Sequence, residues 1–125
     1  MEDSLLEKLG GESGVGKIVD EYYKRALEDP RIKNRYNGLN LEELKRRETN
    51  LMISLIKKET PVSEGTLLGK DFIVGTPSTS GITKHEFNLL VSIYEESSKD
   101  LGATSYTAQQ FGEAISSIRA DVETH

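Results

Sequence analysis

The chain has 125 residues, which is enough for one domain and too few for two domains that each bury their own core. Leu, Ile, Val and Phe occupy about a quarter of the positions, so we expect the chain to fold. Its 16 basic and 21 acidic residues give a formal charge of −5, which argues against duplex nucleic acid as a partner, because neutralising phosphates needs a basic surface.

Residue counts exclude several kinds of site. The absence of cysteine excludes disulfides, zinc–thiolate sites, iron–sulfur clusters and thiol catalysis. Only His85 and His125 are histidines, so a His-rich metal site is excluded as well. No apolar run approaches the roughly 20 residues of a membrane helix, and acidic residues 1–3 differ from the basic start of a signal peptide. We therefore expect residues 1–125 to form a single cytoplasmic domain without a membrane partner.

Apolar residues recur with helical spacing along most of the chain. A short helix is expected over 4–9, followed by long helices over 14–28, 40–58, 83–101 and 107–122.

The ends of these helices carry recognisable signals. Asn40 and Thr83 are expected to act as N-caps, each followed three residues later by a glutamate. The helical pattern fails over 59–81, where glycine, proline, serine and threonine are frequent. We expect this segment to be irregular and mobile, because long structureless loops are uncommon in small domains.

Residues 11–18 imitate a phosphate-binding loop. They read Gly-Glu-Ser-Gly-Val-Gly-Lys-Ile and fit G-x-x-x-x-G-K, but Ile18 replaces the Ser or Thr that binds Mg²⁺. The preceding residues, 4–9, have helical rather than strand spacing. The sequence therefore predicts a glycine-rich turn between two helices, with Lys17 as a solvated charge.

Several short sequence motifs resemble those of a known protein family. They are Ser-Leu-Leu-Glu-Lys-Leu-Gly-Gly at 4–11, Val-Asp-Glu-Tyr-Tyr-Lys-Arg at 19–25, Gly-Leu-Asn-Leu at 38–41 and Gly-Ile-Thr-Lys-His-Glu-Phe at 81–87. Together they resemble the truncated haemoglobins, chiefly the first group of that oxygen-binding family. The resemblance covers most of the chain and implies an all-α, globin-like two-over-two helical sandwich.

The resemblance also implies a site. Tyr23 lies where the family has a distal tyrosine that hydrogen-bonds a diatomic ligand on haem iron, and Glu48 lies where the family has a polar distal residue, often glutamine. The implied ligand pocket is lined by Tyr23, Leu44, Glu48, Leu51 and Phe87. Alternatively, Tyr23 is a core tyrosine bonded to a neighbour, and Glu48 reaches the edge of its helix.

The chain departs from the family on the other side of the haem. The family's iron-binding histidine comes shortly before the Gly-Ile-Thr phrase, and a gapless alignment places that position on Pro77. No histidine precedes His85. A haem held by an imidazole in the usual place is therefore excluded. The sequence predicts a degenerate haem site, a chain with no cofactor and no bound metal, and a role in binding or regulation with an unknown small ligand or protein partner. No nucleophile, imidazole and carboxylate set indicates an enzyme.

Two alternatives stay open. In the first, the chain binds haem for O₂ or NO chemistry through unusual axial ligation, with His85 as a displaced ligand or with a Tyr, a Lys or Met52 in that role. His85 is two residues before the core position Phe87, so we expect it to point partly outwards. In the second, the chain is a helical protein-interaction module that uses segment 59–81 as its contact surface.

Overall fold

The structure, a computed structural model, describes residues 4–57 and 84–117. Its elements are helices, in chain order α1 (Leu5–Lys8), α2 (Gly11–Glu28), the 3-10 helix η1 (Lys33–Tyr36), α3 (Leu41–Ile56), α5 (Lys84–Asp100) and α6 (Ser105–Ser116).

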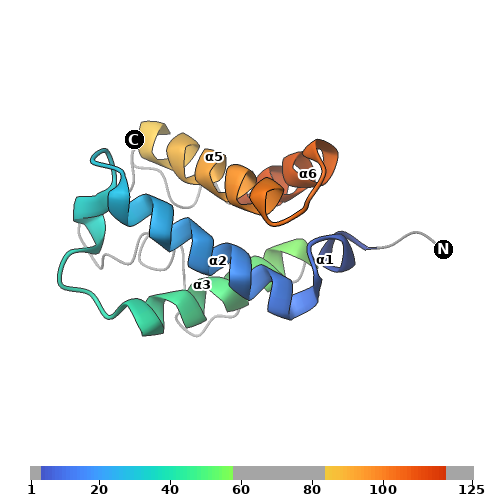
Figure 1. The fold of residues 1–125 in the computed structure, drawn as a ribbon, viewed down its shortest axis with the longest axis horizontal. Helices are drawn as coiled ribbons and strands as arrows, with labels where there is room; N and C mark the ends of the chain where they lie inside the picture. The colour runs from blue at the N-terminus through green and yellow to red at the C-terminus, as the bar shows by residue number, and fades with distance from the viewer. Residues whose placement is uncertain (1–3, 58–83, 118–125) are drawn as a thin grey trace.

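The long helices form two pairs, α2 with α3 and α5 with α6, as Figure 1 shows. Helix α2 also packs on α5 and so joins the two pairs. The predicted all-α two-over-two arrangement is confirmed for these helices. Segment 59–81, predicted to be irregular, lies outside the described residues.

Capping side chains fix where the helices begin. The backbone N–H of Glu43 donates to Asn40 Oδ1 over 3.1 Å, which confirms the predicted start of α3. Thr104 caps α6 in the same way and starts it two residues before the predicted 107. The predicted cap at Thr83 lies outside the described residues.

The glycines near the start of α2 shape a tight turn and a close contact. Gly10 and Gly11 have φ of 97° and 76°, the left-handed region that favours glycine. A side chain at Gly14 would collide with the carbonyl oxygen of Leu9. Helix α2 begins at Gly11, three residues before the predicted start. The predicted glycine-rich turn is thus confined to Gly10 and Gly11, and the rest of the phosphate-loop look-alike is helical, with Lys17 exposed.

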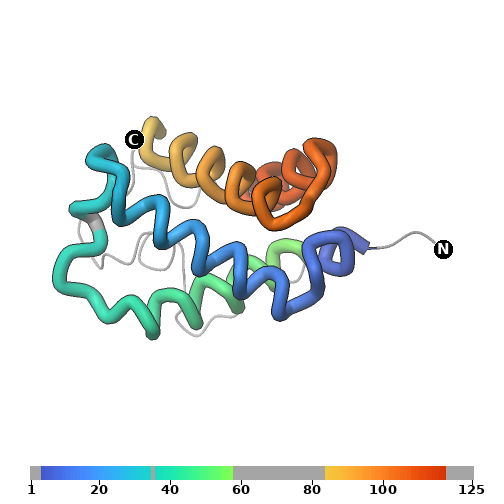
Figure 2. The backbone as a smooth tube through the Cα atoms, in the orientation of Figure 1, coloured from blue at the N-terminus to red at the C-terminus, as the bar shows by residue number. Residues whose placement is uncertain are grey.

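Helix α2 contributes to the core on two sides. Because α3 and α5 both pack on it, consecutive positions such as Ile18 and Val19, or Tyr22 and Tyr23, are buried together. The tube in Figure 2 shows α2 running between these two neighbours. Such adjacent pairs belong to one amphipathic stripe, because its positions repeat at i+3, i+4, i+7 and i+8. The tertiary packing supplies the two helices, α3 and α5, that cover this stripe.

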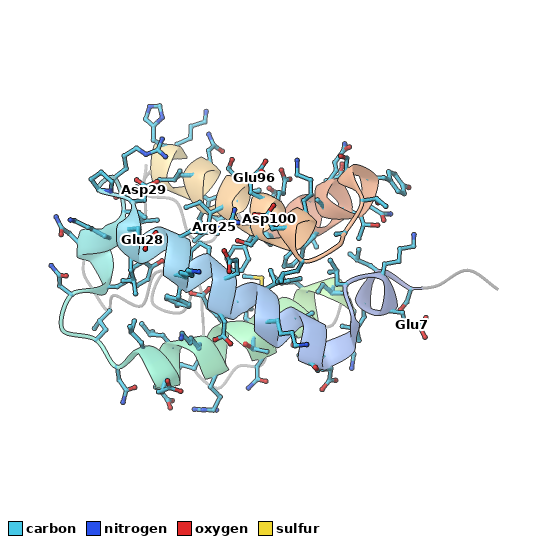
Figure 3. The ribbon with its side chains drawn as sticks, in the orientation of Figure 1. Glu7, Arg25, Glu28, Asp29, Glu96 and Asp100 are labelled. Atoms are coloured by element: carbon cyan, nitrogen blue, oxygen red, sulfur yellow. The ribbon has the colours of Figure 1, made fainter. Side chains whose placement is uncertain are left out.

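An ion-pair network crosses from α2 to α5 at the surface. Arg25 Nε donates to Glu21 Oε2 over 2.8 Å, and its guanidinium also pairs with Asp100. Figure 3 shows Arg25 and Asp100 lying together at the junction of the two helices. Partly exposed pairs of this kind contribute about 0 to 1 kcal/mol each.

Among the described residues, no helix is both long and apolar enough to span a membrane.

Candidate functional site

Within residues 4–57 and 84–117, one carboxylate is fully buried, that of Glu48 in the middle of α3, with 0% of its surface exposed. Two tyrosine hydroxyls donate hydrogen bonds to it. Tyr23 Oη donates to Oε2 over 2.6 Å, and Tyr94 Oη donates to Oε1. Both oxygens of the carboxyl group are therefore occupied by protein donors from α2 and α5.

Two further tyrosines extend this group. Tyr22 stacks face to face on Tyr94, with ring centroids 4.1 Å apart and planes at 5°. The hydroxyls of Tyr22 and Tyr36 are hydrogen-bonded over 2.7 Å. We call the five residues, Tyr22, Tyr23, Tyr36, Glu48 and Tyr94, the tyrosine–glutamate cluster.

The cluster depends on the central place of α2. Tyr22 and Tyr23 are adjacent in sequence, and their rings meet edge to face at 5.2 Å and 85°. One hydroxyl of the pair reaches η1, at Tyr36, and the other reaches α3, at Glu48. The turn after α2 returns the chain so that η1 lies against α2, which brings Tyr36 to the cluster. Three helices and η1 thus meet at one polar core.

Burial dominates the electrostatics of the cluster. It raises the pKa of Glu48 to about 8, and the hydrogen bonds from Tyr23 and Tyr94 act in the opposite direction. Within the described part of the chain, Glu48 has no ion pair that would compensate its charge. Burial also raises the pKa of the Tyr22, Tyr23 and Tyr94 hydroxyls, so they stay protonated, and those of Tyr23 and Tyr94 donate to Glu48. The carboxyl group is the member of the cluster that titrates near neutral pH.

All five residues predicted to line a pocket are buried: Tyr23, Leu44, Glu48, Leu51 and Phe87. Tyr23 and Glu48 are brought into direct contact, as the alternative of a core tyrosine bonded to a neighbour expects. The alternative for Glu48 is wrong, because its carboxylate faces α2 and α5 in the core and does not reach the edge of its helix. A pocket lined by these residues stays a prediction.

The helix predicted over 83–101 carries Tyr94 on its apolar face, but no polar role was predicted for this residue. The signal was present in the spacing, because Tyr94 is seven residues after Phe87 and four after Leu90 on one buried face of α5. A buried tyrosine usually needs a partner for its hydroxyl. Glu48, the carboxylate predicted for the interior, was the acceptor to pair with it.

His85 lies in the first turn of α5 and is exposed, as expected, while Phe87 is fully buried. Residues two apart on a helix do not share a face. Of the residues the structure describes, none offers an imidazole to the interior. The donor set in this part of the chain therefore does not fit a haem held by an interior histidine.

Truncated hemoglobins are among the known proteins that this chain resembles in sequence and in structure. No family model matches the chain. Group 1 truncated hemoglobin GlbN of Mycolicibacterium paratuberculosis is 22% identical over 121 residues, which cover 97% of this chain and 85% of that protein. The crystal structure of truncated hemoglobin from Tetrahymena pyriformis in its Fe(III) form superposes with a TM-score of 0.81 at 20% identity, covering 98% of this chain and 100% of the other.

This chain has the fold of the truncated haemoglobins. The 2/2 hemoglobin from Synechococcus sp. PCC 7002, solved with covalently attached heme, agrees with a TM-score of 0.71 at 18% identity over 94% of each chain. The resemblance read from the sequence is thereby confirmed. In this truncated-haemoglobin fold, the tyrosine–glutamate cluster lies where α2, α3 and α5 meet.

Proposed function

We propose that this chain is a truncated-haemoglobin-like protein that works without haem, as a binding or regulatory module. The observation that carries the proposal is the bond from Tyr23 to Glu48. A phenol has one hydrogen to donate, and here a carboxyl group inside the protein receives it. Tyr23 can therefore serve an iron-bound ligand only if it first gives up Glu48.

The second support comes from the cost of opening the cluster. Freeing Tyr23 leaves one oxygen of a fully buried carboxyl group without a donor, and an unsatisfied buried group costs about 1 to 3 kcal/mol. A gas ligand that needs this hydrogen bond would have to repay that cost. The cluster is therefore better suited to hold the helices together than to face a ligand on iron.

Haemin titration tests the proposal. Protein produced with ample haem is expected to be colourless, and added haemin is expected to give no saturable Soret band at one equivalent. The Tetrahymena pyriformis protein, whose structure is in the Fe(III) form, serves as the positive control for haem uptake. A saturable band of defined spin state in this chain would overturn the proposal.

The alternative is a haem-binding globin with unusual axial ligation. The neighbouring structures favour it, since one is in an Fe(III) form and another has covalently attached heme. His85→Ala is the decisive variant, because its exposed side chain can be removed without disturbing the core. Loss of a haem spectrum in this variant would assign His85 as the ligand, and an unchanged spectrum would remove it from that role.

A further inference from the structure

The chain concentrates its easily oxidised side chains in one place. Cysteine and tryptophan are absent, which leaves five tyrosines as the residues that lose a single electron most readily. Four of them belong to the tyrosine–glutamate cluster and are almost fully buried. The fifth, Tyr106, is 64% exposed. An electron removed from the interior of this protein therefore comes from the cluster.

Among these four residues, Tyr94 combines two features that favour oxidation. A phenol that loses an electron becomes strongly acidic, so it needs a base at its hydroxyl, and the hydroxyl of Tyr94 donates to Glu48. Its ring also lies flat on that of Tyr22, and two stacked rings share positive charge better than one. Tyr23 has the base but meets Tyr22 edge-on. Tyr22 has the stacking, but its hydroxyl partner Tyr36 is another phenol and a poor base.

We propose that Tyr94 is a one-electron oxidation site, in which the stacked Tyr22 shares the positive charge that develops on the ring as the electron leaves, and Glu48 accepts the phenolic proton to give a neutral tyrosyl radical. In the reaction, the O–H bond of Tyr94 breaks, its proton forms a new O–H bond on Glu48, and one electron passes to the oxidant. An organic peroxyl radical is the class of oxidant that suits this step. It takes up the electron, gains a proton from water and leaves as a hydroperoxide.

Burial is expected to lengthen the lifetime of a radical on Tyr94. Tyrosyl radicals decay mainly by meeting a second radical, and the rings of Tyr22 and Tyr94 have no exposed surface. A radical on the exposed Tyr106 has no such protection. The structure thus separates one shielded oxidation site from one accessible tyrosine in the same chain.

The protonation state of Glu48 controls the step. The titratable groups that interact with it are Tyr22 and Tyr23 from α2 and Tyr94 from α5. Burial raises the pKa of Glu48 to about 8, so at lower pH the carboxyl group keeps its own proton and cannot accept another. Oxidation is therefore expected to become easier as the pH rises through that value.

The experiment uses the purified full chain carrying Tyr106→Phe, which removes the exposed tyrosine. Photogenerated tris(bipyridine)ruthenium(III) serves as the one-electron oxidant, between about pH 6 and about pH 10. Transient absorption and electron spin resonance measure the tyrosyl radical. Its yield is expected to rise about tenfold over this range as Glu48 ionises.

Three variants in the same background locate the site. Tyr94→Phe is expected to lower the radical yield at least about tenfold, whereas Tyr23→Phe, which removes the other donor to the same carboxyl group, keeps most of it. Glu48→Gln, which cannot accept a proton, is expected to abolish the rise with pH. An unchanged yield in Tyr94→Phe, or an unchanged pH profile in Glu48→Gln, would overturn the proposal.

A further measurement keeps the test decisive if Tyr94→Phe does not fold. A ring-fluorinated tyrosine placed at position 94 keeps the hydroxyl and adds a fluorine splitting to the spin resonance signal when the radical resides there. Absence of that splitting excludes Tyr94. Haem content is measured separately by absorption, so failure of the oxidation site and failure of the haem-free proposal give different results.

Discussion

Two of the three glutamates of helix α3, Glu43 and Glu48, lie five residues apart in opposite environments. Glu43 lies on the outer face, where the guanidinium of Arg46 and then that of Arg47 hold its pKa below the usual value. Glu48 lies on the inner face, where burial raises its pKa to about 8. The same side chain on the same helix thus ionises more readily than usual at one position and less readily than usual at the other.

The partners of the two glutamates also differ in how far away they lie along the sequence. Glu43 pairs with residues three and four positions along its own helix, a contact that an isolated helix would also make. Glu48 binds tyrosines from two other helices, one 25 and one 46 residues away in sequence. The outer site is therefore a local feature of α3, whereas the inner site exists only in the assembled fold.

The largest expected effect comes from removing each carboxyl group in turn. Glu48→Ala is expected to lower the free energy of unfolding by about 3 to 5 kcal/mol, because it leaves a cavity and two buried hydroxyls without their acceptor. Glu43→Ala, the matched control, is expected to leave the free energy of unfolding nearly unchanged, because its ion pairs are exposed to solvent. Urea denaturation near pH 6 measures both, and equal losses would contradict the contrast between the two faces.

The contributions of Glu48 and Glu43 to stability are expected to change with pH in opposite directions. Because the folded state raises the pKa of Glu48 from 4.5 to about 8, the folded chain binds the extra proton between these values. The contribution of Glu48 to the free energy of unfolding is thus fully present below about pH 4.5. It decreases by a few kcal/mol in all as the pH rises from about 4.5 to about 8, and it is lost above that value.

Glu48→Gln is expected to flatten this decline, so its stability relative to the parent chain should rise with pH. Glu43 has a lowered pKa, so its contribution is present above its ordinary pKa and is lost as the pH falls through the folded value. Glu43→Gln should therefore change the curve only in acid. Denaturation midpoints over a pH series test this, and parallel curves for the parent and Glu48→Gln would show that Glu48 does not titrate as described.

The donors to Glu48 should have intermediate effects. Tyr94→Phe and Tyr23→Phe each remove one hydroxyl while keeping the ring, and each is expected to cost about 1 to 2 kcal/mol. Each hydrogen bond lowers the pKa of Glu48, so its loss should extend the decline in stability to higher pH. Thermal unfolding followed by circular dichroism measures both. A shift toward lower pH would contradict the assignment of these hydroxyls as donors.

The smallest effect is expected on the outer face. Arg46→Ala removes an exposed partner of Glu43 and should change the free energy of unfolding by less than about 0.5 kcal/mol, with even less effect in high salt. Urea denaturation at low and high salt checks this. A loss as large as that of Tyr94→Phe would mean that the outer ion pairs stabilise the fold as much as the buried cluster does.

Much of the fold was readable from the sequence because its signals are local. Helical spacing predicted the long helices, and Asn40 correctly marked the start of α3. The start of α2 was placed three residues late, because Gly11 and Gly14 resemble turn residues when the close contact with Leu9 is unknown. The site was only half predicted. Tyr23 and Glu48 followed from the family resemblance, whereas Tyr94 read as an ordinary core residue.

The sequence by itself determined the long helices, the Asn40 cap, the absence of cysteine and tryptophan, and the positions of the two histidines, since these depend on residue identity and near neighbours. Only the tertiary structure decided that Glu48 would be enclosed between two tyrosine hydroxyls and titrate near neutral pH. The reason is that a pKa and a hydrogen-bond partner depend on what surrounds a group in space. For Glu48, those surroundings come from helices that are distant in sequence.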